Sequence, residues 1–470
     1  MTLFQILILS SFALLAGVLT QTQHRRWLLL AGSVLAIYWM QPSMPIRYLD
    51  FWLPTAALML TVWVWASVRT KSSDNGQRTE RWSALILVGA ALLVALLRYL
   101  EPLCCLTPTR PPQMGVVTLL LGGSALIAWR LQQGKQTWVV NGFAAFLILL
   151  LVVLKTPALA QAASAGFRSL SGQQVDLASS LDIRWLGFSY LAFRLVHVLL
   201  DAAAGRLPVL ALDEFVLYAL FFPTYTAGPI DRVQRFVGDL RAPARLGENL
   251  LPAGQRMVIG VFKKFALADG LALIALNDTN ALQIIAPGWG WVLLYAYALR
   301  IYLDFSGYTD IAIGLGMLVG VKLPENFKAP YFKPNLMAFW NSWHITLAQW
   351  FRAYYFNPLT RALRGRKLPV PAVIFLTQVT TMILIGLWHG VTWNFLIWGA
   401  WHGVGLFVHN RWSDAFRMLY TQWEVSPRLK SVLNGAGILL TFHFVTLGWV
   451  WFALSMPQVS WQLLLRLFGI

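Results

Sequence analysis

The chain has 470 residues, of which 58% are hydrophobic and only 12% are charged. Soluble proteins carry about 25% charged residues, so this composition excludes a soluble globular protein. Two cysteines are too few for a disulfide-rich secreted protein. A net charge of +18 would suggest nucleic-acid binding in a soluble chain. The basic residues lie in short loops between apolar runs, as the positive-inside rule describes, so no nucleic-acid partner is expected.

Apolar segments that reach or approach the length of a membrane-crossing helix follow one another from the N-terminus. The predicted spans are 3–20, 27–40, 51–68, 83–100, 115–131, 138–154, 185–201, 211–227, 257–276, 288–320 (one or two helices), 337–356, 371–397, 398–410 and 434–453. Some are shorter than the ~20 residues needed to cross alone, so an all-α polytopic protein with about 11 to 13 membrane helices is expected. The first segment lacks a basic n-region and a convincing cleavage site, which predicts a retained helix and not a signal peptide.

Loop charge predicts the orientation of the chain. The loops after the first and third predicted spans contain the basic residues Arg25, Arg26, Arg69, Lys71, Arg78 and Arg81. The intervening loops have fewer basic residues. Cytoplasmic loops are enriched in Lys and Arg, so the N-terminus is predicted to be extracytoplasmic.

Polar residues divide the chain into two parts of different character. Residues 1–160 contain few ionisable groups within apolar segments and are predicted to form an N-terminal transmembrane scaffold. From about residue 185, ionisable residues appear inside apolar stretches. A charge at membrane depth is costly, so such residues usually face a cavity and have a function.

Three histidines lie in Trp-rich apolar surroundings, at Trp343-His344, Trp388-His389-Gly390 and Trp401-His402. Histidine is suited to proton transfer near neutral pH, although a single membrane histidine is about as often a hydrogen-bond partner between helices. His389 is the strongest catalytic candidate because Gly390 allows close approach of backbone or substrate. These spacings fit no known zinc motif, so no metal is expected.

Two further features allow a functional and a structural interpretation. Asp304 and Asp310 flank Gly307 in an apolar run and suit acid–base catalysis, but the favoured interpretation is that each carboxylate satisfies backbone or Arg donors at a helix break. Cys104 and Cys105 are adjacent, and two inert thiols are expected more than a vicinal disulfide.

Several blocks in one order resemble the membrane-bound O-acyltransferase (MBOAT) family, in particular its bacterial branch of alginate O-acetylation and teichoic-acid D-alanylation membrane proteins. The blocks are Phe221-Phe222-Pro223, Ala227-Gly228-Pro229, Phe262-Lys263-Lys264, Asp304-Phe305-Ser306-Gly307-Tyr308, Leu323-Pro324-Glu325-Asn326-Phe327, Phe339-Trp340-Asn341-Ser342-Trp343-His344 and Leu387-Trp388-His389-Gly390. The resemblance covers about residues 185–455, which would form the catalytic core without a separate soluble domain.

The resemblance implies a ring of helices around a tunnel in the bacterial inner (plasma) membrane, with His389 at its centre and His344 as the second active-site histidine. His389 would act as general base on a sugar hydroxyl, and His344, Trp388 or backbone amides would donate hydrogen bonds to the developing oxyanion. The expected substrate-binding or supporting residues are Trp388, Trp343, Asp304, Ser306, Tyr308 and Asn341.

The same resemblance implies that the chain would be an O-acetyltransferase that acts on an exported or cell-surface polysaccharide. The acyl donor is a thioester substrate, acetyl-CoA or an acyl carrier protein, and no bound cofactor is expected. Membrane lipid and an extracytoplasmic partner acyltransferase or polysaccharide synthase complex are the expected partners. Asn341-Ser342 differs from the Arg-Arg of the alginate type, which leaves D-alanyl transfer open. An acyl-relay or transporter subunit of a cell-envelope complex is a third alternative.

Overall fold

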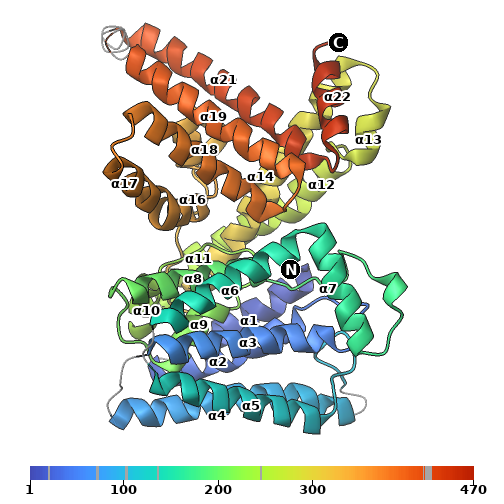
Figure 1. The fold of residues 1–470 in the computed structure, drawn as a ribbon, viewed down its shortest axis with the longest axis vertical. Helices are drawn as coiled ribbons and strands as arrows, with labels where there is room; N and C mark the ends of the chain where they lie inside the picture. The colour runs from blue at the N-terminus through green and yellow to red at the C-terminus, as the bar shows by residue number, and fades with distance from the viewer. Residues whose placement is uncertain are drawn as a thin grey trace. The chain divides into compact units, whose positions relative to one another are not determined.

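The computed structural model describes residues 1–18, 22–69, 74–100, 104–134, 137–243, 246–416, 418 and 426–470. All regular structure in these ranges is helical, as predicted, and none of their residues lies in a strand (Figure 1). The chain divides into two compact units. The first unit contains Met1–Val258 and Asp310–Pro324, and the second contains Ile259–Thr309 and Glu325–Ile470.

The first unit is built from eleven labelled helices and the end of a twelfth. They are α1 (Leu3–Val18), α2 (Thr22–Trp39), α3 (Leu49–Val68), α4 (Asp74–Leu96), α5 (Met114–Gln133), α6 (Thr137–Lys155), α7 (Pro157–Leu170), α8 (Phe188–Ala203), α9 (Leu212–Leu220), α10 (Val233–Arg241), most of α11 (Leu246–Val261) and the last turns of α14 (Pro287–Leu318). Short 3-10 helices cover Leu97–Tyr99 and Val175–Leu177.

The second unit contains most of α14 and the remaining helices. They are α12 (Asp269–Ala272), α13 (Asp278–Gln283), α15 (Leu336–Trp340), α16 (Ile345–Phe351), α17 (Asn357–Gly365), α18 (Val370–His389), α19 (Trp393–Ala415), α21 (Pro427–Ala453) and α22 (Pro457–Leu467). Two π-helical segments, Phe262–Ala268 and Arg352–Phe356, and a 3-10 helix, Pro330–Phe332, complete it.

Six helices of the described residues are long and apolar enough to cross a membrane. They are Leu49–Val68, Gln77–Tyr99, Met114–Gln133, Trp138–Lys155, Val370–His389 and Pro427–Ala453. In α6 only 6% of the apolar window is buried, against 61% in α3, so α6 offers its side chains to lipid and α3 forms protein interior. The chain is a multi-pass membrane protein. The count of 11 to 13 spans and the tunnel stay predictions.

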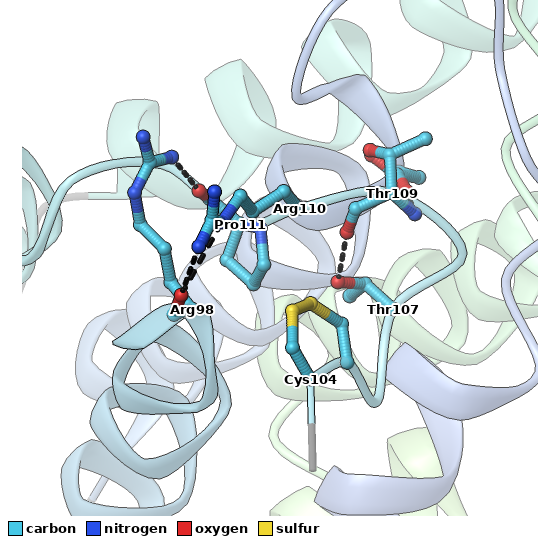
Figure 2. The surroundings of a disulfide bond; sticks show 8 residues. Arg98, Cys104, Thr107, Thr109, Arg110 and Pro111 are labelled. Atoms are coloured by element: carbon cyan, nitrogen blue, oxygen red, sulfur yellow. Dashed lines mark hydrogen bonds between the residues drawn. A yellow bond between two sulfur atoms is a disulfide. The ribbon is translucent and has the colours of Figure 1, made fainter. Parts of the chain in front are cut away.

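The loop between α4 and α5 is tied to α3 by a buried carboxylate. Asp50 accepts the backbone N–H and the hydroxyl of Thr109, both at 2.7 Å. In the same loop Thr107 donates its hydroxyl to the carbonyl of Thr109 at 2.7 Å (Figure 2). Cys104 and Cys105 are joined by a disulfide in this loop, so the expectation of two free thiols is wrong.

A buried ionic cluster joins α2 to α9 and α10 in the first unit. Arg26 lies 3.0 Å from Asp213 and 2.9 Å from Glu214, and Arg241 lies 2.8 Å from Glu214. Arg25 is fully buried and donates to two backbone carbonyls at the end of α10, at 2.9 and 2.7 Å. Arg25 and Arg26 were counted as loop charges, whereas Arg25 is buried and Arg26 pairs with two buried carboxylates. The extracytoplasmic N-terminus therefore rests on the remaining loop residues and stays a prediction.

Helices α18 and α19 form a closely packed hairpin in the second unit. A Cβ at Gly399 would lie 2.5 Å from the carbonyl oxygen of Met382 and 2.6 Å from the Cα of Ile383. A Cβ at Gly403 would lie 2.7 Å from the Cα of Val379. Small residues that let two backbones touch are typical of helix pairs in membranes. The resulting hairpin holds His389 at its tip.

Candidate active site

His344 is the N-cap residue that directly precedes helix α16, at the end of a tight turn. The turn follows α15, whose N-terminus is capped by Asn335 through a hydrogen bond from Ala338 N–H at 2.8 Å. His344 has a φ of 41°, in the left-handed region that non-glycine residues rarely adopt, and its side chain is buried. The predicted span 337–356 is therefore wrong as one helix. Its apolar residues continue through the turn because they face the protein interior on both sides of it.

A neighbouring segment without regular secondary structure, 321–327, holds this turn through Asn326, which is fully buried. The backbone N–H of Ile345 donates to the carbonyl of Asn326 at 3.0 Å. The side-chain oxygen of Asn326 accepts the backbone N–H of Thr346 at 3.2 Å and its hydroxyl at 2.9 Å. The same oxygen lies 3.2 Å from Nδ1 of His344. Asn326 therefore ties the turn and the imidazole together.

His389 is the last residue of α18. The chain leaves the helix at Gly390, where a Cβ would lie 2.8 Å from the ring of Phe395. Helix α19 then begins, with the Thr392 hydroxyl accepting the N–H of Phe395 at 3.5 Å. The predicted boundary between spans 371–397 and 398–410 is therefore wrong, because glycine and a capping threonine end the first helix earlier.

Aromatic rings surround the imidazole of His389 and connect it to His344. Phe395 lies nearly parallel to the His389 ring at 5.8 Å between centroids, and Phe452 meets it edge-on at 4.7 Å. Trp388 lies 4.6 Å from His389 and 6.1 Å from His344. The structure thus brings the two predicted histidines to the same aromatic cluster. His389 and Trp388 are half-buried in this cluster, which limits the access of water to the imidazole.

Helix α14 contributes an apolar contact to His344 and carries two of the predicted supporting residues next to it in sequence. Phe305 meets the His344 ring edge-on at 4.7 Å. Ser306 and Tyr308, two of the predicted supporting residues, are buried on the same helix. Trp343 is also buried and stacks on Phe339 at 5.6 Å, so it stabilises the turn.

The two carboxylates of α14 have separate basic partners. Asp304, whose side chain is 48% exposed, forms an ion pair with Lys264 of the π-helical segment. Asp310 forms an ion pair with Arg256 at 3.0 Å. This matches the structural interpretation of the pair, except that α14 is continuous and no helix break occurs at Gly307. The glycine instead allows the π-helical segment to approach α14 closely, since a Cβ at Gly307 would lie 2.9 Å from the backbone nitrogen of Lys264.

Asn341 lies at a cavity of about 380 Å³. Its side-chain oxygen accepts a hydrogen bond from Arg352 at 2.7 Å. The cavity is lined by Met337, Trp340, Asn341, Ala348, Arg352, Phe356, Gln378, Thr381, Met382, Ile385 and Leu406. The lining is mainly apolar, and Ile385 stands one helical turn before His389. Asn341 therefore supports this cavity.

Sequence reasoning did not identify Asn326 and Phe305 as contacts of His344, although both occur in the quoted motif blocks. It also gave no role to His402, which is completely buried and lies 4.9 Å from Trp398 and 5.2 Å from Trp340. In the described ranges, no group of three or more His, Cys, Asp or Glu side chains is arranged to hold a metal ion.

These features define a multi-pass helical membrane protein with two histidines held in one aromatic cluster, in which His344 is buried and His389 is half-buried. Residues 124–450 match the model of the MBOAT, membrane-bound O-acyltransferase family, and the chain belongs to this family.

Three curated relatives illustrate the range of the family. The probable alginate O-acetylase of Pseudomonas aeruginosa is 34% identical over 60% of this chain and 51% of its own length. The teichoic acid D-alanyltransferase of Streptococcus thermophilus is 32% identical over 58% of this chain and 68% of its own. The peptidoglycan O-acetyltransferase of Helicobacter pylori is 30% identical over 55% of this chain and 47% of its own length. The match spans about half the length of the alginate relatives.

Proposed function

We propose that the chain is a membrane-bound O-acyltransferase that moves an acetyl group from a cytoplasmic thioester to hydroxyls of an exported or cell-surface polysaccharide. The observation that carries the proposal is the convergence of His344 and His389 on Trp388 in a protein of this family. O-acetylation is favoured because two of the three kinds of relative are named as O-acetylases or O-acetyltransferases.

In the proposed reaction His389 takes the proton of the acceptor hydroxyl. The oxygen then attacks the thioester carbonyl, a C–O bond forms, the C–S bond breaks and the proton passes to the leaving thiolate. A sugar hydroxyl is a poor nucleophile until a positioned base removes its proton, so His389 supplies the group that this step needs. Aromatic side chains around the imidazole keep water from competing with the acceptor.

The donor is a substrate, either acetyl-CoA or an acylated carrier protein, and no bound cofactor is required. The proposed site lies in the bacterial inner membrane, with the N-terminus outside the cytoplasm. An extracytoplasmic acyltransferase or a polysaccharide synthase complex is the proposed partner, together with membrane lipid.

D-alanyl transfer to a surface polymer is the second candidate. The relative named teichoic acid D-alanyltransferase supports it, because the match covers 68% of that protein's length. A relay of the acyl group to a separate transferase, or transport of an acylated lipid, would use the same membrane setting.

The test compares surface polysaccharide from cells that produce the wild-type protein, His389→Ala or His409→Ala at equal membrane levels. Mass spectrometry measures ester-linked acyl groups. We expect His389→Ala to abolish one ester, whose mass identifies the acyl group, and His409→Ala to retain it because His409 has no assigned role. Unchanged esters in a folded His389→Ala protein would contradict the proposed mechanism. Purified protein incubated with [¹³C]acetyl-CoA and alkali-treated polysaccharide then separates direct transfer from relay.

A further inference from the structure

We infer that Asn326 is a positioning residue of the site, which holds the proton of neutral His344 on Nδ1 so that Nε2 accepts a hydrogen bond from a hydroxyl of the acceptor other than the one that His389 deprotonates. The role of Nε2 rests on the proposed acyl transfer. The protonation state itself rests on hydrogen-bond geometry alone.

The orientation of the Asn326 amide follows from its contact with the backbone. The N–H of Thr346 points at the side chain of Asn326, at 3.2 Å, and a backbone N–H is always a donor. The amide atom that it meets must therefore be the oxygen, because an NH₂ group in that place would put two donors face to face. The Thr346 hydroxyl, at 2.9 Å from the same oxygen, can rotate to donate as well.

The orientation of the amide determines the tautomer of His344. The Asn326 oxygen carries no proton and lies 3.2 Å from Nδ1, so Nδ1 must donate. A neutral imidazole has one N–H, and a neutral His344 therefore has an unprotonated Nε2 with a free lone pair. The hydrogen bond that one ring nitrogen makes sets the state of the other.

Nε2 of His344 is buried and has no hydrogen-bond partner among the described residues. Its ring is bounded by Phe305 and Trp388, which offer apolar surface. A buried acceptor without a donor is unfavourable, and a substrate hydroxyl supplies the missing donor. As an acceptor, Nε2 cannot donate to an oxyanion. Of the donors expected from the sequence, Trp388 and backbone amides remain for that task.

Backbone hydrogen bonding holds the turn that carries the imidazole. His344 has a φ of 41°, and its neighbour Ile345 donates to the Asn326 carbonyl at 3.0 Å. Unusual backbone conformations of this kind are often found at active sites, where surrounding contacts maintain them. A substitution of the Asn326 side chain leaves that carbonyl in place. It therefore removes the contact with Nδ1 without removing the backbone hydrogen bond.

The first test reads the tautomer directly. Full-length protein labelled with [¹⁵N]histidine is placed in lipid nanodiscs, and its imidazole nitrogens are recorded by solid-state NMR at neutral pH. The His344 signals are assigned by their loss in His344→Gln. We expect a protonated Nδ1 and an unprotonated Nε2 in the wild type, and a mixed population in Asn326→Leu. A protonated Nε2 in the wild type would overturn the inference.

The second test measures kcat/KM for alkali-treated surface polysaccharide, with [¹³C]acetyl-CoA as donor. We expect Asn326→Leu to lower kcat/KM about tenfold, the size expected for the loss of one hydrogen bond to the substrate. Asn326→Asp, which still accepts from Nδ1, should recover most of the loss. Asn335→Ala is the control, because that asparagine also accepts a backbone N–H but touches no histidine. Its kcat/KM per folded protein should stay within about twofold of wild type.

The outcomes separate this inference from the proposed function. Equal losses in Asn326→Asp and Asn326→Leu, or unchanged kcat/KM in Asn326→Leu, would overturn the positioning role. If the NMR signals are as expected but the wild-type protein transfers no acyl group, the proposed function fails while the assignment of the His344 tautomer stands.

Discussion

Gly390 is a position where the smallest side-chain addition reaches a ring of the His389 site. A Cβ there would lie 2.8 and 2.9 Å from two ring atoms of Phe395, the ring stacked on His389. Its φ of 179° suits any residue, so the effect of Gly390→Ala comes from the ring contact alone. We expect the alanine to displace Phe395, destabilise the fold by about 1–3 kcal/mol and lower ester formation per folded protein. Ester content divided by membrane protein level measures the effect.

A second substitution tests the cause of that loss. Phe395→Leu removes the ring atoms that the alanine would meet. Gly390→Ala/Phe395→Leu should therefore form more ester than Gly390→Ala alone, since the two residues are in contact and their effects are coupled. A double variant no more active than the less active single variant would show that Gly390 acts through something other than Phe395.

Single positions also show how far the sequence could predict this site. The Trp-His blocks placed His344 and His389 as candidates, because residue type and the following glycine are local signals. The contact of Asn326 with Nδ1 of His344 is not local, since it depends on a segment 18 residues earlier that is hydrogen-bonded to the turn. The same holds for His402, whose aromatic surroundings come from α15, α19 and α21.

At the scale of helices, the glycines of the α18–α19 hairpin determine how closely the two backbones approach. Gly399→Ala would put a Cβ 2.5 Å from the Met382 carbonyl oxygen, and backbone atoms cannot move aside as a side chain can. We expect the variant to be destabilised by about 1–3 kcal/mol, with a lower thermal unfolding midpoint in detergent. Gly435→Ala on α21 is the control, because a Cβ there meets no atom within 4 Å. A helix-interior alanine at that position should leave the midpoint unchanged or raise it.

Helix ends were predicted less well than helix existence, for a physical reason. Residues 371–410 are apolar with little interruption, so hydropathy alone could not locate the end of α18. Glycine at 390 and the capping threonine at 392 were the available signals. Within 337–356 the turn at His344 carries no proline or glycine, and it is maintained by hydrogen bonds from outside the segment.

The loop that follows α7 is anchored by a carboxylate outside the predicted spans. Asp182 lies 2.7 Å from the Ser164 hydroxyl, 2.9 Å from Arg168 Nη2 and 3.1 Å from the Ser179 N–H. Burial alone would raise the pKa of Asp182, but these hydrogen bonds and the Arg168 charge together hold it below its usual value. The ionised form is therefore favoured in the folded state.

Asp182→Asn should lower the free energy of unfolding by about 1–3 kcal/mol at neutral pH. A folded-state pKa below the unfolded value of about 3.9 adds stability above that pH, and the stability is lost as pH falls through the folded pKa. The difference in unfolding midpoint between wild type and variant should therefore shrink below about pH 4. Asp176→Asn, at an exposed position of the same loop, is the control. A difference that persists unchanged at acid pH would contradict the assignment to the ionised carboxylate.

At the scale of the whole chain, charge serves two purposes that the sequence alone does not separate. Arg26 neutralises Asp213 and Glu214 in the first unit, while other basic residues lie in exposed positions such as Arg78. The composition correctly predicted a helical multi-pass protein. The count of basic residues per loop was less informative, because an arginine in a buried ion pair says little about the side of the membrane.

The remaining exposed charges still favour an extracytoplasmic N-terminus, and thiol labelling tests it. In a Cys104→Ala/Cys105→Ala background, single cysteines are introduced as Thr2→Cys and Arg78→Cys. A membrane-impermeant maleimide applied to intact spheroplasts should label residue 2, and residue 78 only after permeabilisation, because Lys- and Arg-rich loops stay on the cytoplasmic side. After detergent solubilisation both cysteines should be labelled, which shows that neither is protected by burial inside the protein. The reverse pattern in spheroplasts would place the N-terminus in the cytoplasm and invert the proposed sides of donor and acceptor.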